Sequence, residues 1–533
     1  MLYLGTLDDG LLLDDVAIYG GLRVARAGHP GAHWWDLYYL GGFDERLRFS
    51  GRLPWWVAQG AQLHFFRPAA AASHYVDVLL WPDQVPLMHL QNLVWFAATG
   101  GAVAWLYRDA LSSPTEVLVA LAVFLLAYTH EWPVQWLAAR NTAMATFFGV
   151  VSIASFRRWN HAWWCRVLAL AGLGLSLLSS ELGVSAVAFS ASFEFMRSGE
   201  EKKGRWWRLG TTFGLVAAWR VAYILGGFGA RGSGTYIDPG SAPFAFLEVA
   251  PERLLVELLA LLGPPELLVD PAVPAAYRTV LWALVVATVV LVLFKARGND
   301  LLPWSVGAAI CLVLLVASVP QPRLLGFVVL GWAPLVARAL AQAWSLGGRW
   351  RVLVPLAGVH QLVLGPLVVT GAFDSLRPTE LVGLGAPGRG LGDLGGRNLF
   401  LLNPPTYASA KMVEAVRDSE GLSMPAFVWS LAIGDHIDVT RSGCCTVVLR
   451  SEDGMFRERW AAMYRGPQVP FSEGDIVMTL GFTATVRKVS SGGRPMEVAF
   501  EMSGPLRSRQ YVFAWWNGRD YEVVAASDIP PER

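Results

Sequence analysis

Charged residues are scarce in this sequence. Only 16% of the 533 residues are Asp, Glu, Lys or Arg, whereas 54% are hydrophobic. A water-soluble domain usually carries about 25% charged residues, so much of this surface must face something other than water. The net charge of +1 lacks the basic excess that is typical of nucleic-acid-binding proteins, and we therefore expect no nucleic-acid partner.

Cysteines and common enzyme motifs are also lacking. The four cysteines have neither the spacing of a disulfide framework nor that of a metal site: Cys165 and Cys311 lie in apolar runs, and Cys444 and Cys445 are adjacent. The sequence contains no Walker loop, no G-x-S-x-G nucleophile elbow and no H-E-x-x-H zinc motif. It therefore does not support the enzyme classes that these motifs define, and the cysteines leave the compartment open.

Apolar stretches recur along the first 371 residues. They lie at about 89–107, 115–129, 141–156, 164–180, 183–196, 209–227, 276–294, 303–319, 323–343 and 352–371. A membrane span usually needs about 17–25 residues. The stretch 253–269 is broken by Gly263, Pro264 and Pro265, so we expect it to be interfacial or re-entrant. The sequence predicts an all-α polytopic membrane bundle of about 10–12 transmembrane helices with a C-terminal, small, mostly-β soluble domain.

Basic residues in the loops predict the orientation. Alternate loops carry Arg108, Arg157, Arg158, Arg166, Arg197, Lys202, Lys203, Arg205, Arg208, Lys295, Arg297, Arg349 and Arg351. The opposite loops hold only Arg140, Arg231 and Arg323. Because basic loops stay in the cytoplasm, we expect an inner-membrane protein whose first large loop (14–88) and C-terminal domain are extracytoplasmic. The N-terminus, MLYLGTLDDGLLLDD, is too short and too acidic for a span or a signal peptide, and we favour a further span before Met1.

The chain changes character after residue 371. A Gly-rich linker (372–397) follows the predicted membrane domain (1–371). The remainder (398–533) begins with a predicted buried strand, NLFLLNPP, and a short amphipathic helix, ASAKMVEAVRDSEG, closed by Gly421. Alternating runs then predict strands: CTVVLR, DIVMTLGFTATVRKV, MEVAFEMSG and RQYVFAWWNGRDYEVVAA.

Two adjacent carboxylates, Asp14 and Asp15, follow three leucines and precede Val16. Adjacent carboxylates repel, and an apolar margin raises the pKa of at least one, as a general base or metal ligand requires. A solvated pair or a helix N-cap is the alternative.

The segment FFRPAAAASHYVDVLLW (65–81) holds a second set of candidates. A guanidinium such as that of Arg67 forks onto phosphate oxygens, although anchoring to lipid head groups would suit it as well. His74 and Asp77 share one face of the Pro-started helix that follows, and such a helix can lie in the interface. His89 and Asn92 open the next span, where we expect them to act as polar contacts between helices.

A third set lies in THEWPVQWLAARN (129–141). His130 and Glu131 share this short outer loop with Arg140, and an uncompensated Glu131 would be costly there. We therefore expect Glu131 to pair with Arg140 or to hold a metal. Glu181, at the end of a later span, is expected to be an ordinary helix-end charge, and Tyr236 is a further polar candidate in an outer loop.

These fragments, in this order, resemble the GT-C superfamily of membrane glycosyltransferases, and most of all the bacterial relatives of protein O-mannosyltransferases. The matching segments are LLLDDVAIY, FFRPAAAASHYVDVLLWPDQVPLMHLQNL, HEWPVQWLAARN and LSSELGVSA, with PQPRLLGFVVLG as a later basic outer loop. The likeness covers roughly residues 11–200 well and 200–371 loosely. The sequence departs from the family in having SSE where Ser-Lys-Glu is commoner and in its β-rich tail.

The resemblance implies an inverting transfer from a polyprenyl-phosphate-linked sugar to an acceptor hydroxyl at the outer face. Asp14 or Asp15 would then be the base, and Arg67, Arg140 or Arg323 would neutralise the departing phosphate. Glu131 would orient the acceptor or help to hold a divalent cation. Membrane lipids are expected partners, whereas the acceptor, whether protein, glycan or lipid, stays open.

Two other classes of function stay open at this point. A lipid or solute transporter would also have many spans, but such transporters usually show internal repeats and broken helices at mid-membrane. A non-catalytic membrane anchor for the β domain would not need so many charged outer residues.

The predicted orientation is testable with single cysteines in a cysteine-free background. A cysteine placed in the basic loop 198–206 should be protected from an impermeant thiol reagent in intact cells, because that loop is expected to be cytoplasmic. A cysteine in 231–240 should react. The opposite labelling pattern would reverse the orientation.

Overall fold

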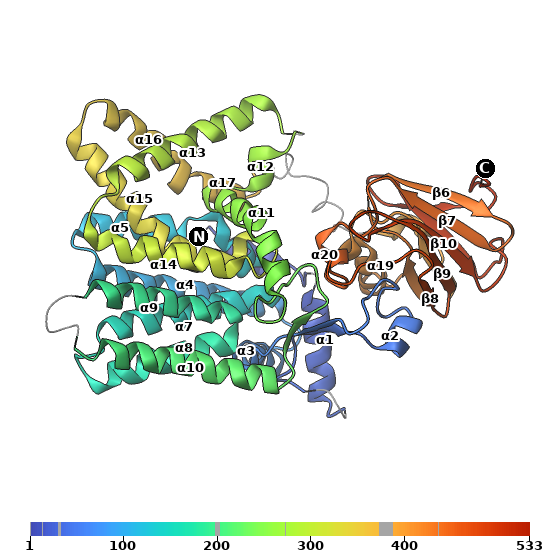
Figure 1. Cartoon of the computed structure of the whole chain (residues 1–533), viewed down its shortest axis with the longest axis horizontal. Coiled ribbons are helices and arrows are strands. Elements are labelled where there is room, and N and C mark those ends of the chain that lie inside the picture. Colours follow the sequence, from blue (N-terminus) through green and yellow to red (C-terminus); the bar gives the residue numbers. More distant parts are fainter. Residues whose placement is uncertain are drawn as a thin grey trace. The chain divides into compact units, whose positions relative to one another are not determined.

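The structure is a computed structural model that describes residues 2–12, 14–29, 33–197, 203–271, 273–372, 387–434 and 436–532. It divides into two compact units (Figure 1). The first, called the membrane unit below, consists of Met1–Tyr38, Phe65–Phe228 and Leu247–Arg377. The second, called the sheet unit, consists of Tyr39–His64, Gly229–Phe246 and Pro378–Arg533. The predicted fold class, a helical membrane bundle with a C-terminal β-rich region, is confirmed.

The membrane unit is built from helices. Short 3-10 turns lie at η1 (Leu4–Asp8), η2 (Tyr128–His130), η3 (Leu137–Ala139), η4 (Glu181–Val184), η6 (Asn299–Leu301) and η7 (Pro322–Leu324). The helices are α1 (Asp14–Arg26), α3 (Pro68–Leu80), α4 (Val85–Ala110), α5 (Pro114–Leu125), α6 (Glu131–Gln135), α7 (Arg140–Arg157), α8 (Trp163–Ser179), α9 (Ser185–Met196), α10 (Arg205–Leu225), α11 (Pro243–Leu262), α12 (Pro265–Val269), α13 (Ala275–Lys295), α14 (Leu302–Leu315), α15 (Gly326–Leu346), α16 (Arg349–Leu362) and α17 (Leu364–Val369).

Every predicted apolar stretch contains one of these helices, and the stretch 253–269 is interrupted at Gly263 and Pro264, between α11 and α12. Within the described residues, four helices are long and apolar enough to cross a membrane: Leu137–Arg157, Ala275–Lys295, Gly326–Leu346 and Arg349–Val369. The pair Pro114–Leu125 and Tyr128–Gln135 qualifies as one broken span, bent by 50°. Of the predicted cytoplasmic loop, residues 198–202 lie outside the described residues.

The span-length helices fall into two kinds. Those containing α7 and α15 are mostly buried within the unit, whereas α13 and the α16–α17 pair are mostly exposed. The exposed apolar side chains of α13 include Val280, Val286 and Leu293. An exposed face of this kind is stable against lipid but not against water, so these helices are suited to a lipid-facing position in an integral membrane protein.

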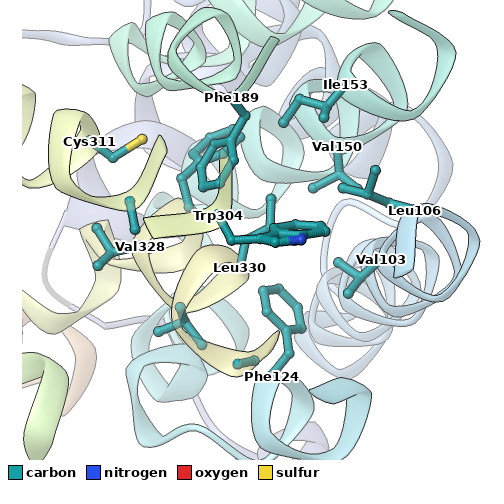
Figure 2. Close-up of a cluster of buried hydrophobic side chains, with 14 of the residues drawn as sticks. Val103, Leu106, Phe124, Val150, Ile153, Phe189, Trp304, Cys311, Val328 and Leu330 are labelled. Atoms are coloured by element: carbon teal, nitrogen blue, oxygen red, sulfur yellow. The ribbon is translucent and has the colours of Figure 1, made fainter. Parts of the chain in front are cut away.

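The centre of the membrane unit is a cluster of buried apolar side chains (Figure 2). Trp304 of α14 is fully buried there and packs edge-on against Phe193 and Tyr107. Phe124 of α5, Phe189 of α9 and Leu330 of α15 belong to the same cluster and are labelled in the figure. One core therefore joins helices that are far apart in the sequence.

Small residues bring α7 and α8 into close contact. Ser152 Oγ donates to the Ala169 carbonyl and Ser176 Oγ to the Ala145 carbonyl, both at 2.7 Å. A Cβ on Gly172 would lie only 2.9 Å from the Phe148 carbonyl oxygen. Small side chains and hydroxyl bonds are the usual means of packing helices in lipid, where the hydrophobic effect does not drive association.

The sheet unit contains three sheets. A three-stranded sheet has the order β1 (Tyr39–Gly42), β2 (Gln62–His64), β3 (Gly229–Arg231), and a short helix, α2 (Glu45–Phe49), lies between its first two strands. An antiparallel five-stranded sheet has the order β6 (Ile437–Ser442), β7 (Thr446–Ser451), β10 (Pro495–Met502), β9 (Phe482–Val489), β8 (Ile476–Met478). A mixed four-stranded sheet has the order β12 (Tyr521–Val524), β11 (Tyr511–Trp516), β4 (Asn398–Leu401), β5 (Phe427–Ser430).

The predicted tail elements agree with this topology. Strand β4 and helix α19 (Tyr407–Ser419) match the predicted buried strand and amphipathic helix, and Gly421 has a φ of 66°. Each predicted alternating run contains one or two strands. The unit also contains η9 (Arg389–Leu391) and α20 (Arg459–Ala462). Of the predicted linker, residues 373–386 lie outside the described residues.

The sheet unit is completed by two segments that the sequence suggested belonged to the membrane domain. Trp55 and Trp56 are almost fully buried in the core of the sheet unit. Their indole N–H groups donate to the carbonyls of Leu431 and Ala461, each at 3.0 Å. The ring of Trp56 stacks on Phe456 with centroids 4.2 Å apart. Residues 39–64 are therefore part of the core of this unit.

The α7–α8 contact predicts opposite effects for two glycines on one helix. Gly172→Ala should lower stability by about 1–3 kcal/mol, because the new methyl group must push the α7 backbone away. Gly174→Ala should be neutral or stabilising by up to about 1 kcal/mol, because nothing lies within 4 Å of its Cβ position and alanine favours the helix. Thermal unfolding of the detergent-solubilised protein would measure both effects, and equal melting temperatures for the two variants would contradict the packing.

Candidate functional site

Asp15 is held at the first turn of α1. Its side chain is completely buried, Oδ1 accepts the Ala138 N–H at 2.6 Å, and Oδ2 accepts the Leu12 N–H at 2.9 Å. Burial raises the pKa of Asp15 to about 7, although both amide hydrogen bonds oppose the shift. The interpretation of a solvated acidic pair is therefore wrong for Asp15, whose carboxylate joins the start of α1 to the 137–139 turn.

Asp14 is only half-buried and lies near a cation. Burial raises the pKa of Asp14, and the charge of Arg323 opposes that shift. The Arg323 guanidinium lies 4.9 Å from the centroid of the Trp136 ring, and its Nε donates to Gln321 Oε1 at 2.6 Å. Trp136 in turn donates to the Leu12 carbonyl at 3.2 Å, which connects this corner to the start of α1.

Arg140 is completely buried, and its carboxylate partner is Asp77 at 2.6 Å. The predicted pairing with Glu131 is wrong, because the folded α3 brings a carboxylate from 63 residues away into hydrogen-bonding contact. Nitrogens at all three positions of the guanidinium donate to other groups inside the unit as well: Asn92 Oδ1 (2.5 Å), Ser73 Oγ (3.0 Å), Gln91 Oε1 and the Met88 carbonyl (2.9 Å). Asn92 is thus a polar contact between helices, as expected.

A continuous chain of hydrogen bonds leads from Asp77 to Tyr38. Tyr19 OH donates to Asp77 Oδ2 at 2.6 Å and lies 3.1 Å from His74 Nδ1. His74 Nε2 lies 3.3 Å from Tyr38 OH. His74 has no exposed surface, and burial lowers its pKa well below the usual value, so the ring is neutral at physiological pH.

Arg67 forms a second ion pair. Its Nε and Nη2 donate to Glu181 Oε2 at 2.9 and 2.6 Å, and Tyr223 OH donates to Glu181 Oε1 at 3.0 Å. The guanidinium lies over the rings of Phe65 and Tyr38, at 4.6 and 5.1 Å from their centroids. Glu181 is therefore a specific partner and not an ordinary helix-end charge.

Tyr38 is the point at which these groups meet. Burial raises the pKa of its hydroxyl, and the charges of Arg67, Arg140, Asp15 and Arg323 also act on it. Residues from the start of α1, from the position before α3, from the start of α7 and from the turn before α15 are therefore close enough to this buried tyrosine to act on it electrostatically. Two of these groups, Arg67 and Arg323, are half-buried guanidinium groups, and the half-buried Asp14 carboxylate is next to Asp15 in the chain. Carboxylates and guanidinium groups of this kind are suited to moving a proton beside a developing anion.

The other predicted residues are more scattered. His89 Nε2 lies 3.4 Å from the Gly10 carbonyl, and His130 is buried against Phe96 and Phe124. Glu131 is buried at the start of α6. Tyr236 belongs to the sheet unit, where its N–H donates to Ser233 Oγ at 3.3 Å. Within the described residues, no group of three or more His, Cys, Asp or Glu side chains is placed to hold a metal ion.

Four aromatic residues of the site were not predicted. Tyr19 lies one helical turn after Asp15, so its position on the same face of α1 was a readable signal. Tyr38 and Tyr223 reach their partners only through tertiary folding, and no local pattern marks them. Trp136 had a weak signal, since it lies between Glu131 and Arg140 in a short polar loop.

No family model and no curated protein matches the chain. Among solved structures, it is similar to the archaeal oligosaccharyltransferase AglB from Archaeoglobus fulgidus, in complex with an inhibitory peptide and a dolichol-phosphate: 13% identity, TM-score 0.40, 70% of this chain covered. The match spans about half (53%) of that protein. The chain is also similar to ArnT from Cupriavidus metallidurans: 14% identity, TM-score 0.35, 72% of this chain and 82% of that one.

The buried ion pair predicts a large asymmetry between two arginines. Arg140→Met should lower stability by about 3–5 kcal/mol, because it leaves the Asp77 carboxylate buried without a cation. Adding Asp77→Asn to that variant should recover part of the loss, since the amide carries no charge. Arg23→Met, which removes an exposed ion pair with Asp83, should cost less than about 1 kcal/mol. Thermal unfolding of the detergent-solubilised variants would measure this, and similar losses for Arg140→Met and Arg23→Met would contradict it.

Proposed function

We propose that this protein is an inverting glycosyltransferase that moves a sugar from a polyprenyl-phosphate donor to an acceptor hydroxyl at the extracytoplasmic face of the membrane. The observation that carries the proposal is the arrangement around Tyr38, where Asp15, Arg67, Arg140 and Arg323 all act on one buried hydroxyl. The order of the sequence motifs supports it as well.

Asp14 is the better candidate for the general base. Both oxygens of Asp15 already accept backbone N–H groups, and its side chain has no exposed surface. Asp14 is half-buried, so an acceptor hydroxyl can reach it, and burial raises its pKa toward the range useful for proton transfer. Asp15 then acts as a positioning residue that holds Leu12 and Ala138 around the base.

The proposed reaction is a single displacement at the sugar C1. Asp14 takes the proton of the acceptor hydroxyl while the acceptor oxygen forms a bond to the sugar C1. The bond between C1 and the phosphate oxygen breaks on the opposite face, which inverts the configuration at C1. The polyprenyl phosphate that leaves gains a negative charge, and Arg67 and Arg323 are the groups that we propose to stabilise it.

Arg140 has a different proposed role from the one that the sequence suggested. Its guanidinium is enclosed by Asp77, Asn92 and Ser73, so it has no surface with which to bind a phosphate. It acts instead as a fixed positive charge that joins α3, α4 and α7. Glu131 stays the candidate for orienting the acceptor, and no metal site is assigned.

The test is the transfer of label from polyprenyl-phosphate sugars in membranes that contain the protein, with Asn variants of three aspartates. Asp14→Asn should lower transfer by about 10²–10⁴-fold, because it removes the proton acceptor and keeps the size of the side chain. Asp15→Asn should lower it less, and Asp8→Asn should change it little, because Asp8 lies outside the matched motifs.

The pH profile separates the two aspartates further. A general base works only when deprotonated, so transfer should rise with pH through the pKa of the base. If Asp15 were the base, this rise would lie near pH 7 and Asp15→Asn would abolish it. Full transfer by both Asp14→Asn and Asp15→Asn would overturn the proposed mechanism.

A further inference from the structure

We propose that His74 is a positioning residue that, through Tyr38, holds the Arg67 guanidinium in place for the donor phosphate. This inference rests on the proposed function and adds to it a residue that contacts Tyr38 and acts on the donor only through Arg67. It is carried by the contacts of His74, by the direction of the hydrogen bonds through its ring and by the stacking of Arg67 on Tyr38.

His74 has no access to solvent, and each of its ring nitrogens forms a hydrogen bond with a tyrosine hydroxyl. Nδ1 lies 3.1 Å from Tyr19 OH, and Nε2 lies 3.3 Å from Tyr38 OH. A buried imidazole could satisfy its nitrogens with backbone groups, and this one instead joins two side chains from separate segments. The ring therefore connects Tyr19 of α1 to Tyr38, and both contacts depend on the same tautomer of His74.

The direction of the hydrogen bonds can be worked out from the charged end. Tyr19 has one hydroxyl proton, and it donates that proton to the Asp77 carboxylate at 2.6 Å, the strongest acceptor within reach. The contact between His74 Nδ1 and Tyr19 must then be donated by Nδ1–H. A neutral imidazole with its proton on Nδ1 has a lone pair on Nε2, so Tyr38 OH must donate to Nε2.

Tyr38 is thereby fixed at its hydroxyl while its ring supports Arg67. The ring centroid lies 5.1 Å from the guanidinium carbon of Arg67, and Phe65 lies on the same cation at 4.6 Å. Glu181 accepts from Nε and Nη2. A guanidinium held by rings and a carboxylate loses less side-chain freedom when it binds phosphate, so binding of the donor is stronger.

The proposal predicts which substitutions are tolerated at His74. A glutamine places its amide oxygen close to the position of Nε2 and can accept from Tyr38. An asparagine reaches only the position of Nδ1 and cannot accept from Tyr38. We therefore expect His74→Gln to retain most of the donor affinity and His74→Asn to lose it, and Tyr38→Phe to behave like His74→Asn because it removes the donated proton and keeps the ring.

The experiment measures kcat and the KM for a polyprenyl-phosphate sugar in membranes containing each variant. His74→Asn and Tyr38→Phe should raise the donor KM about 3- to 10-fold, the range for one lost hydrogen bond, with kcat changed less than about twofold. In an Arg67→Ala background the same two substitutions should raise KM no further, because they act through Arg67. Tyr75→Phe is the matched control. Tyr75 is on the same helix as His74, and its ring stacks on Trp34 and not on Tyr19 or Tyr38.

The outcomes separate the two proposals. If the unaltered protein transfers no sugar, the proposed function fails and this inference fails with it. If the protein is active and Tyr38→Phe leaves KM unchanged, or raises it equally with and without Arg67, only the role of His74 is overturned. Should His74→Asn fail to fold, Tyr38→Phe still decides, because it removes a single oxygen atom.

Discussion

The membrane unit depends on the neutralisation of one buried cation. Arg140 begins α7, which belongs to the most buried of the four span-length helices, and its guanidinium has no contact with solvent. Removing such a charge from water costs several kcal/mol, which is offset only when its donors are all used and a carboxylate is at hand. Asp77 supplies that carboxylate, and the other partners of Arg140 come from α3 and α4. The relative placement of these three helices is thus fixed by charge as well as by packing.

The proposed site combines fully buried groups with half-buried ones. Arg140, Asp77 and His74 are fully buried, whereas Asp14, Arg67 and Arg323 are half-buried. Buried groups set distances and tautomers, and half-buried groups can meet a substrate. The two sets are joined through tyrosines, because a phenol offers both a hydrogen bond and a ring surface to a neighbouring cation. Tyr38 uses both.

The sequence was most informative where the structure is local. Apolar runs located the helices, and alternation such as TVVLRS located the strands, because both patterns follow from the period of the backbone. Pairings between residues far apart in the sequence could not be predicted. Arg67 pairs with Glu181, which is 114 residues away. Arg140 pairs with Asp77 and not with Glu131, the acidic residue of its own loop. The burial of Trp55 and Trp56 in the sheet unit was missed for the same reason, although two tryptophans in a supposedly open loop were a warning.

The discontinuous composition of the sheet unit has a consequence for how the protein is made. Trp55 and Trp56 share a core with Phe513, which the ribosome adds roughly 460 residues later. At about 5–20 residues per second, the two indoles wait some 20–90 s before their partners exist. During that interval an exposed aromatic segment lies between helices that are already inserting, where it is open to aggregation or to capture by a chaperone. The unit therefore cannot fold vectorially, because its core closes only after residues that are far apart in the chain have all been synthesised.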